Sequence, residues 1–239
     1  MKYKNLPIVK VHSCKSTQDE SLRGLTQLKN PEHKIFWFQS LKQSHGRGRQ
    51  GHKWIDNKTE ALLISASFLW PKNIKLSPHL TLIAGLSLWN SLSHFKKDSR
   101  VCIKWPNDIV GLENNSIYKI GGILSEARRD LITIGWGINL KGKAPLKKAK
   151  VLSEYFGDKT PNDKALANSL RKEFVSNLNR IIKANSWNEF HLKLESKAMA
   201  PLWGKRIYVL KKYKGIAIGL DKSGALLLKK SDKEIHKII

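Results

Sequence analysis

The stretch SLKQSHGRGRQGHKW, residues 40–54, places three glycines and two arginines within residues 46–51. Glycine lets backbone N–H groups approach a ligand closely, and arginine offers a planar, permanently charged fork that matches carboxylate and phosphate oxygens. The stretch therefore predicts a loop that wraps an anion. The ordinary alternative is a flexible basic loop on the surface. The rest of the sequence is needed to distinguish these two interpretations.

The composition indicates a folded protein with a strongly basic surface. The chain has 239 residues, of which 41% are hydrophobic, enough for one medium domain with a small appendage. Its formal net charge of +25 would attract a polyanion, such as nucleic acid, an anionic membrane or an acidic protein. The lysines are scattered along the chain, however, and a general lysine bias explains the charge equally well.

Cysteine and apolar patterning point to the cytoplasm. The two cysteines, Cys14 and Cys102, form neither a disulfide framework nor a zinc pattern. The first residues lack an apolar signal core, and the apolar stretches 61–70 and 80–89 are too short to span a bilayer. We therefore expect a cytoplasmic protein that makes no use of a membrane.

The alternation of strand and helix patterns predicts an α+β fold, in which helices flank a mixed sheet. A helix-start signal at Ser77-Pro78 precedes the helix expected at 80–92. A hairpin loop is expected at 113–118 and a basic linker at 141–150. Past Pro201, short strands predict a separate all-β module. Strands are expected at 6–12, 35–38, 61–68, 101–105, 109–112, 119–126, 131–140, 205–211, 214–220 and 225–229, and helices at 17–28, 80–92 and 160–184.

Two further features are suited to binding a ligand. Ser16 and Thr17 offer hydroxyl groups, although Thr17 and Glu20 also have the spacing of a helix capping box, the more ordinary interpretation. Glycines on two neighbouring strands predict either a flat molecule lying on the sheet or tight packing of a helix, with equal weight. These glycines are Gly121, Gly122, Gly135 and Gly137.

Motif spacing excludes several chemistries. The sequence has no P-loop, no Gly-x-Ser-x-Gly elbow and no Cys/His cluster at metal spacing. It does combine the Gly/Arg loop with Lys119 and an Asn107-Asp108 turn. Cationic groups of this kind stabilise charge on a carboxylate or phosphate, and the carboxylate of Asp108 is suited to Mg²⁺ beside phosphate oxygens. The pattern favours acyl activation or phosphate chemistry.

Five stretches, in this order, together resemble the biotin–protein ligases, or biotin–[acetyl-CoA-carboxylase] ligases. Residues 215–228 further resemble the small SH3-like end domain of that family, so the resemblance covers nearly the whole chain. The five stretches are STQDE (16–20), GRGRQGHKW (46–54), KWPND (104–108), KIGGILSE (119–126) and IGWGIN (134–139).

The resemblance implies a fold and a two-step reaction. A class II synthetase-like catalytic domain would span residues 1–196, and a small SH3-like β-barrel 197–239. The enzyme would use ATP and Mg²⁺ to convert biotin into biotinyl-5′-AMP. It would then transfer the biotinyl group to a lysine of the biotin carboxyl carrier protein, a subunit of acetyl-CoA carboxylase. A sheet edge serves dimerisation or carrier docking in this family, so a homodimer is also an expectation.

The resemblance also implies residue roles. The expected catalytic residues are Lys119, Arg47 and Arg49, and Asp108 is the expected metal ligand. The expected biotin-binding residues are Ser16, Thr17, Gln18, Gln43, Gly46, Arg47, Lys119, Gly122, Gly135 and Gly137. The expected ATP- and adenylate-binding residues are Arg49, Trp54, Asn107, Asp108, Lys119 and Asn139.

Departures from the family pattern occur at Gln18, where Asn is more frequent, at His52, where Arg or Lys is common, and at Trp136, which replaces a smaller apolar residue. The sequence before Ser16 leaves no room for the winged-helix repressor domain of bifunctional members, so we expect no sequence-specific DNA binding. Two alternatives stay open. One is a lipoate or octanoate ligase or transferase of related fold, and the other is a basic nucleic-acid-binding module.

Overall fold

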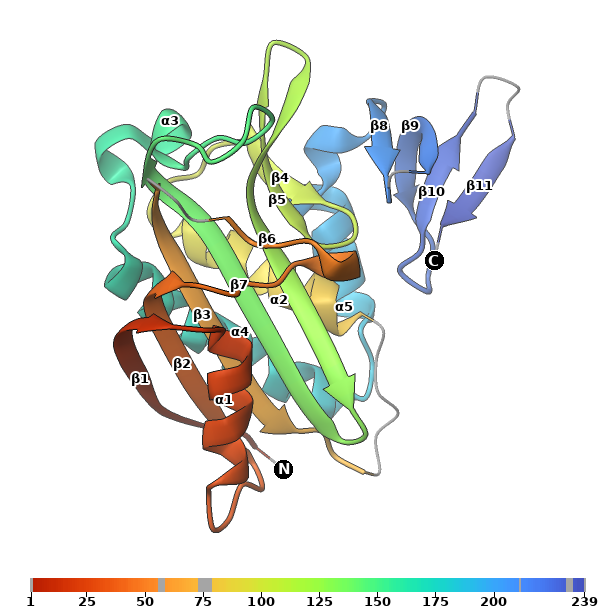
Figure 1. Ribbon diagram of the computed structural model, residues 1–239. Coiled ribbons are helices and arrows are strands. Elements are labelled where there is room, and N and C mark those ends of the chain that lie inside the picture. The colour runs from red at the N-terminus through yellow and green to blue at the C-terminus, as the bar shows by residue number, and fades with distance from the viewer. Residues whose placement is uncertain (1, 56–58, 73–78, 211, 231–233, 239) are drawn as a thin grey trace.

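The described part of the computed structural model, residues 2–55, 59–72, 79–210, 212–230 and 234–238, forms two β-sheets (Figure 1). The larger sheet has seven strands in the order β1-β2-β3-β7-β6-β5-β4, and the smaller has four in the order β11-β10-β9-β8. The strands of the larger sheet are β1 (Lys4–Cys14), β2 (Lys34–Gln43), β3 (Thr59–Leu69), β4 (Val101–Lys104), β5 (Asp108–Glu113), β6 (Ser116–Arg128) and β7 (Leu131–Gly142).

The larger sheet is mixed, which confirms the expected fold class. Its β1–β2 pair is parallel, and the other neighbouring pairs are antiparallel. A parallel pair needs a crossover connection, which helix α1 (Thr17–Thr26) provides. Strands β5 and β6 are joined by Asn114 and Asn115, both with positive φ (46° and 61°). The hairpin loop is therefore shorter than expected, because asparagine tolerates the left-handed conformation of a tight turn.

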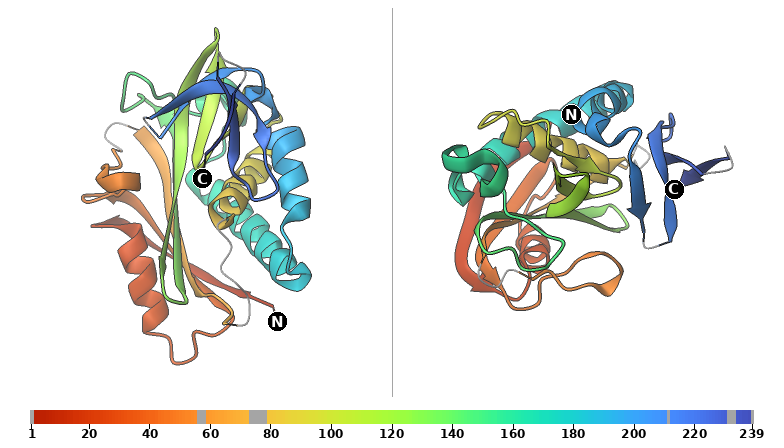
Figure 2. Two further views of the ribbon diagram at one scale, coloured as in Figure 1. Left: turned by 90° about the vertical axis from the view of Figure 1, so that its right-hand side faces the viewer. Right: turned by 90° about the horizontal axis from the view of Figure 1, so that it is seen from above.

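Helices cover both faces of the larger sheet (Figure 2). Helix α1 lies on one face, while α2 (Leu80–Ser93) and α4 (Asp163–Ala184) lie on the other. Helix α2 is apolar on nearly all sides because it is enclosed between the sheet and α4. Ser77 and Pro78, the expected start of α2, lie outside the described residues. The shorter helices on this side are α3 (Ser153–Phe156), η2 (Gly157–Lys159) and α5 (Asn188–Lys193).

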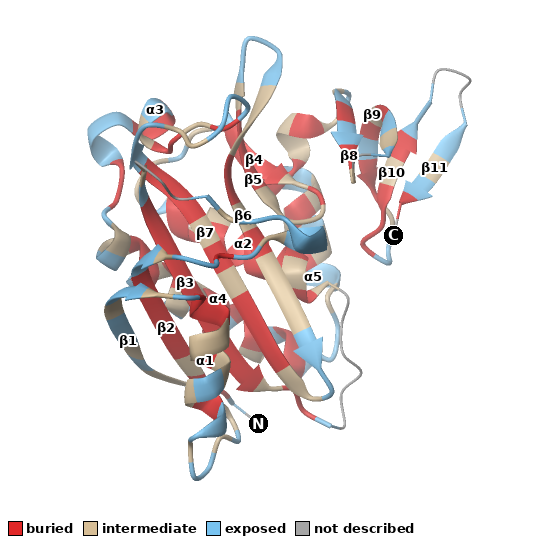
Figure 3. Ribbon diagram, in the orientation of Figure 1, coloured by how far each residue is buried: buried red, intermediate tan, exposed pale blue. Residues whose placement is uncertain are grey.

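The core lies between the sheet and the α2–α4 layer, and the middle of β3 and β7 is buried along most of its length (Figure 3). At its centre the Trp37 and Trp136 rings stack with centroids 5.7 Å apart, and Phe174 of α4 meets both edge-on. The Trp136 Nε1 donates to the Ala84 carbonyl of α2 (3.1 Å). The bulk of Trp136 is therefore accommodated in the core, on the face of the sheet opposite α1.

The smaller sheet comes after a helical connection, η3 (Leu194–Ala198) and η4 (Ala200–Leu202). Its antiparallel strands confirm the expected all-β module, and β11 is a strand that the sequence did not indicate. The expected boundary between residues 196 and 197 falls inside η3, ahead of the first strand of the smaller sheet. The four strands are β8 (Arg206–Val209), β9 (Tyr213–Leu220), β10 (Leu226–Lys229) and β11 (Ile235–Ile238).

Candidate active site

A cavity of about 340 Å³ opens on the α1 face of the larger sheet. Helix α1 and the 46–54 loop border it on one side, and the turn between β4 and β5 borders it on the other. The structure thus brings together segments that are far apart in the sequence. The expected site residues that line this cavity are Ser16, Thr17, Gln18, Gln43, Arg47, Arg49, Trp54, Asn107, Asp108, Lys119, Gly122, Gly135 and Gly137.

The Gly/Arg loop is a short hairpin with a helical tip. The Trp54 N–H donates to the Gly46 carbonyl (2.9 Å), and the Gly48 N–H donates to the His52 carbonyl (2.6 Å). Residues 49–51 form a 3₁₀ turn, in which Gln50 has a φ of 54°. The His52 Nδ1 lies 2.9 Å from the Arg49 carbonyl and therefore donates to it. In this chain, His52 braces the tip of the loop.

Arg47 is held by two carboxylates. Its guanidinium donates to Asp19 of α1 (2.7 Å) and to Glu126 of β6 (3.2 Å). The hydrogen bond from Arg47 lowers the pKa of Asp19, and the same bond raises the pKa of Arg47. These contacts tie the loop to both the helix and the sheet beside the cavity.

One end of the cavity carries a buried network of hydroxyl and amide groups. The Gln43 Oε1 accepts hydrogen bonds from the Thr17 backbone N–H (2.7 Å) and the Thr17 hydroxyl (3.0 Å). The Thr17 hydroxyl also lies 2.8 Å from the Ser65 hydroxyl. Ser16 occupies the N-cap position of α1, without a side-chain capping bond. The capping-box interpretation of Thr17 is therefore wrong, because its hydroxyl is used inside the site.

Three glycines of the sheet make room for side chains that line the cavity. A Cβ atom on Gly137 would meet the Trp54 indole at 2.7 Å, and one on Gly135 would meet the Gln18 side chain at 3.1 Å. A Cβ atom on Gly122 would meet the Lys119 Nζ at 3.2 Å. Gly121 is different, because its missing Cβ makes room for Ile138 and the backbone of β7. The close approach of neighbouring side chains or backbone therefore explains why these positions are occupied by glycine.

The opposite end of the cavity is charged. The Lys119 Nζ lies 2.6 Å from the Asp108 Oδ1, and both side chains are partly exposed. Lys104, at the end of β4, also lines the cavity. Burial lowers the pKa of Lys104, with a smaller contribution in the same direction from Lys119 and an opposing one from Asp108. Two lysines and one aspartate leave this end with net positive charge.

Asn107 connects the charged end to the loop and to the sheet. Its Nδ2 donates to the Ile123 carbonyl (2.8 Å), and its backbone carbonyl accepts from the Ile123 N–H (2.8 Å). The Asn107 Oδ1 accepts from Arg49 (3.3 Å). The second arginine of the loop therefore reaches across the cavity to the turn between β4 and β5.

Two expected site residues do not line the cavity. Gly46 is buried in the loop, where a Cβ atom would meet the Gln43 Nε2 and the Trp54 Cβ at 3.1 Å. Asn139 is 2% exposed and donates to the Lys150 carbonyl (3.4 Å). Within the described residues, its Oδ1 has no hydrogen-bond partner. It lies on β7 on the same face as Gly135 and Gly137, because alternate residues of a strand share a face.

The sequence interpretation missed several lining residues. Lys104 and Trp105 belong to the KWPND stretch and were identifiable from it. Tyr208 and Leu210 come from the C-terminal module, and no sequence signal placed that module at the cavity. The remaining lining residues are Gly48, Gln50, His52, Lys53, Leu63, Pro106, Ile123, Leu124 and Trp136.

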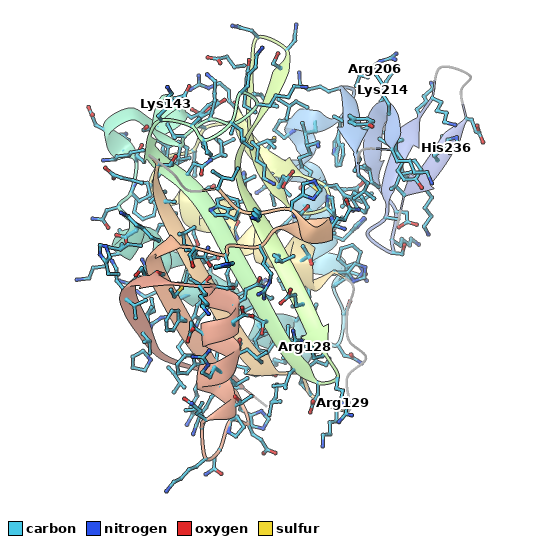
Figure 4. The ribbon with its side chains drawn as sticks, viewed as in Figure 1. Arg128, Arg129, Lys143, Arg206, Lys214 and His236 are labelled. Atoms are coloured by element: carbon cyan, nitrogen blue, oxygen red, sulfur yellow. The ribbon has the colours of Figure 1, made fainter. Side chains whose placement is uncertain are left out.

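The described residues show neither a cluster of metal-ligating side chains nor a gathering of the labelled basic side chains at one place. The described residues contain no group of three or more His, Cys, Asp or Glu side chains that could hold a metal ion. Basic side chains lie at well-separated places, such as Arg129 at one end of the sheet, Lys143 at the other and Lys214 on the C-terminal module (Figure 4). In the part of the chain that the structure covers, no helix has the length and apolarity to cross a membrane.

The family comparison concerns more than half of the chain. Residues 11–139 match the biotin/lipoate A/B protein ligase family. This range contains helix α1, the Gly/Arg loop, the KWPND turn and Lys119, and it ends at Asn139. The match therefore includes the expected site residues at both ends of the cavity.

Solved structures of biotin ligases have the same fold. The biotin protein ligase from Aquifex aeolicus in complex with biotin and ATP has a TM-score of 0.75 and 27% identity, over 99% of this chain and 96% of that one. The biotin acetyl coenzyme A carboxylase synthetase from Helicobacter pylori has a TM-score of 0.63 and 22% identity, over 96% and 98%. The Leishmania major biotin protein ligase in complex with biotinyl-5-AMP also gives 0.63 and 22%, over 97% and 98%.

Proposed function

Because the chain belongs to the biotin/lipoate A/B protein ligase family, we propose that it is an ATP-dependent biotin–protein ligase. It activates biotin as biotinyl-5′-AMP and transfers the biotinyl group to a lysine of a biotin carboxyl carrier protein. One observation carries the proposal: a single cavity has a neutral hydroxyl–amide network at one end and a cationic cluster at the other. A ligand with a polar, uncharged ring and a carboxylate fits such a cavity.

The neutral end suits the ureido ring of biotin. That ring presents two N–H donors and one carbonyl acceptor, and Ser16, Thr17 and Gln43 offer groups of both kinds. Ser16 and Thr17 are nearly fully buried, at 2% and 4% exposure. Since a buried polar group without a partner is costly, such a site discriminates strongly against a ring that lacks the matching groups.

The cationic end suits the first half-reaction. A carboxylate oxygen of biotin attacks the α-phosphorus of ATP, and the bond to the β-phosphate oxygen breaks, so that pyrophosphate leaves. Two anions have to meet, and Lys119 and Arg49 supply positive charge where negative charge develops. Arg47 is engaged by Asp19 and Glu126, which favours a positioning role in the loop over the direct ligand contact expected from the sequence.

The nucleotide would extend along the sheet beyond the cationic end. Trp54 rests on Gly137 and presents an aromatic face, and its Nε1 is buried without a hydrogen-bond partner among the described residues. Asn139 keeps a buried Oδ1 on the same face of β7. We propose that these groups, together with Asn107, bind the adenosine part.

Mg²⁺ enters this scheme with ATP, as part of the substrate. Mg²⁺ uses one or two protein carboxylates together with substrate phosphates, and Asp108 is the carboxylate at the cationic end. The ion pair with Lys119 uses its Oδ1. Asp108 therefore fits as a single protein ligand to the metal of MgATP.

In the second half-reaction, the amine of the carrier lysine attacks the acyl carbon, AMP leaves and the amine loses a proton. The mixed anhydride must be kept from water until the carrier arrives. The 46–54 loop stands at the edge of the cavity and is anchored through Arg47. We propose that its closing over the adenylate supplies that protection.

Acyl-adenylate formation tests the proposal. The protein would be incubated with MgATP and either biotin or lipoate, and acyl-AMP detected by mass spectrometry. We expect biotinyl-AMP, followed by biotin transfer to an added carrier domain. If lipoyl-AMP alone forms, the lipoate or octanoate alternative is correct and the biotin assignment is wrong.

The dispersed basic side chains argue against the nucleic-acid alternative, because such binding uses a contiguous basic footprint. We propose no sequence-specific DNA binding, and a salt titration with duplex DNA would check this. We further propose that the chain divides near residue 196 into a catalytic domain and an SH3-like module. We propose a cytoplasmic location, with which the free thiols of Cys14 and Cys102 are consistent. We also propose that a sheet edge serves either carrier docking or homodimerisation. Sedimentation with and without carrier distinguishes the last two.

A further inference from the structure

Three consecutive carbonyls of the β9–β10 turn each accept a hydrogen bond from an aromatic ring in the part of the chain that precedes the C-terminal module. The donors come from three separate segments: the start of α2, the turn after β4 and the start of α5. A carbonyl only accepts, so the histidine involved must carry its proton on Nε2. The pairs are Trp187 Nε1 with the Lys222 carbonyl (3.0 Å), His79 Nε2 with the Ser223 carbonyl (2.5 Å) and Trp105 Nε1 with the Gly224 carbonyl (3.0 Å).

The turn itself is internally fixed. The Asp221 Oδ1 accepts from the Ser223 N–H (2.8 Å), the Ser223 hydroxyl (2.7 Å) and the Ala225 N–H (3.0 Å). The Gly224 N–H donates to the Asp221 carbonyl (2.9 Å). The three carbonyls are therefore presented in a set direction before any ring reaches them.

Gly224 is required for the docked arrangement. Its φ is +77°, a conformation that other residues rarely adopt. A Cβ atom would meet the His79 ring at 2.6 Å and the Trp187 ring at 2.9 Å, and these two rings stack with their centroids 3.4 Å apart. A side chain at this position would push the turn away from both rings.

Trp105 links this contact to the cavity. The residue is 6% exposed, and the hydrogen bond from its indole to the Gly224 carbonyl is buried. Asn107 and Asp108 follow it after Pro106, and they contact Arg49 and Lys119 respectively. The C-terminal module also contributes Tyr208 and Leu210 to the cavity wall. The β9–β10 turn is therefore connected to the cavity in two ways, through Trp105 and through the lining residues of its own module.

We propose that the turn 221–225 of the C-terminal module positions the charged end of the cavity, with Trp105 as the positioning residue through which it acts. The proposal rests on the proposed function in one respect, the assignment of that end to ATP. The turn holds the indole of Trp105, and the indole fixes the backbone that carries Asn107 and Asp108. The module is then part of the adenylation machinery and more than an attached domain.

A purely structural role predicts a different outcome. If the turn merely joined two units, weakening it would lower stability without preference for one substrate. A positioning role predicts a selective effect, in which the ATP-dependent parameters change and biotin binding at the far end of the cavity does not.

The variant Gly224→Ala tests this, with Gly204→Ala as the matched control. Gly204 has nearly the same φ (+79°), but an added Cβ would meet nothing within 4 Å. We expect Gly224→Ala to lower kcat/KM for ATP about tenfold to a hundredfold more than the control does, because small displacements at a reacting centre have effects of this size. Biotin dissociation constants should agree between the two variants. Equal ATP parameters in the two would overturn the proposal.

Amide hydrogen exchange adds a readout that needs no activity. In Gly224→Ala, the segment 103–110 should exchange faster than in Gly204→Ala, while α4 stays equally protected. Unchanged exchange at 103–110 contradicts the proposal. This comparison stands even if the wild-type protein makes no biotinyl-AMP, so failure of the proposed function is recognised separately.

If Gly224→Ala does not fold, Trp105→Phe decides the matter, since it keeps an aromatic ring and removes the N–H donor. We expect a raised KM for ATP or a lowered kcat with unchanged biotin binding. A Trp105→Phe enzyme with normal ATP parameters would show that the hydrogen bond to Gly224 does not position the site.

Discussion

The Lys119 Nζ lies 2.6 Å from the Asp108 Oδ1, and the missing side chain of Gly122 provides the space for this pair. Lys119 stands on β6 and Asp108 on the neighbouring strand β5, so the sheet fixes their separation. The ion pair keeps the ammonium group at the charged end of the cavity. Because Lys119 is 44% exposed there, a ligand can reach it.

Replacing Lys119 with alanine should lower the rate of adenylate formation about 10²–10³-fold, the usual effect of removing a group that stabilises developing charge. Stability should fall by no more than about 1 kcal/mol, because the pair is partly exposed. Pyrophosphate release and urea unfolding measure the two effects. Lys147→Ala, an exposed lysine outside the site, is the control. A near-normal rate in Lys119→Ala would remove Lys119 from the mechanism.

Replacing Arg49 with alanine should weaken the hold on the adenylate. Arg49 reaches Asn107 across the cavity (3.3 Å), and hydrogen bonds to charged groups contribute about 1.5–3 kcal/mol, so adenylate should dissociate about tenfold to a hundredfold faster. Release of biotinyl-AMP from the loaded enzyme in a chase experiment measures this. Arg129→Ala, far from the cavity, should behave like the wild type (Figure 4). An unchanged release rate in Arg49→Ala would show that the arginine does not contact the intermediate.

The sequence predicted the fold class and half of the described residues that line the cavity, because the motifs are local. The Gly/Arg loop, the KWPND turn and Lys119 each lie within a short stretch, and their residue types reveal their chemistry. What the sequence did not reveal depends on tertiary contacts. The Thr17 hydroxyl turned out to be used by Gln43 and Ser65, which lie 26 and 48 positions away.

Arg47 and Tyr208 show the same limit. The carboxylates that hold Arg47 come from α1 and β6, and no local pattern pairs Asp19 with Glu126. Tyr208 lies in a module with its own sheet, and its place in the cavity wall follows from how that module docks. Long-range packing of this kind leaves no signal in residue spacing.

The Arg47–Asp19 contact predicts a pH-dependent contribution to stability. The folded pKa of Asp19 is lower than its unfolded value, so the contribution is complete above the unfolded pKa of about 3.9 and is lost as pH falls through the folded pKa. Its size should be no more than about 1 kcal/mol, since both side chains are over a third exposed.

Asp19→Asn isolates this contribution. The wild type and the variant should differ in unfolding free energy by a constant amount between pH 5 and pH 7, and the difference should shrink toward zero below about pH 4. Guanidinium unfolding at each pH measures it. Glu20→Gln, which removes a neighbouring carboxylate paired with Arg23 instead, is the control. A difference that persists undiminished at pH 3 would contradict the assignment.

Substitution by alanine should impair activity at Gly137 and increase stability at Gly85. In Gly137→Ala the new methyl group would lie 2.7 Å from the Trp54 indole, which must move. Because Trp54 lines the cavity, adenylate formation should fall and KM for ATP should rise. In Gly85→Ala the methyl group would meet Ile103 at 3.6 Å, an ordinary contact inside helix α2.

Gly85→Ala should therefore stabilise the protein by about 0.5–1 kcal/mol, since alanine restricts the unfolded chain and favours the helix. Its adenylation kinetics should match the wild type, which makes it the control for Gly137→Ala. Thermal unfolding and pyrophosphate release, measured on both variants, test the pair. Destabilisation by Gly85→Ala would mean that the contact between α2 and β4 has no room for a methyl group. Normal ATP parameters in Gly137→Ala would mean that Trp54 does not contribute to the nucleotide side of the site.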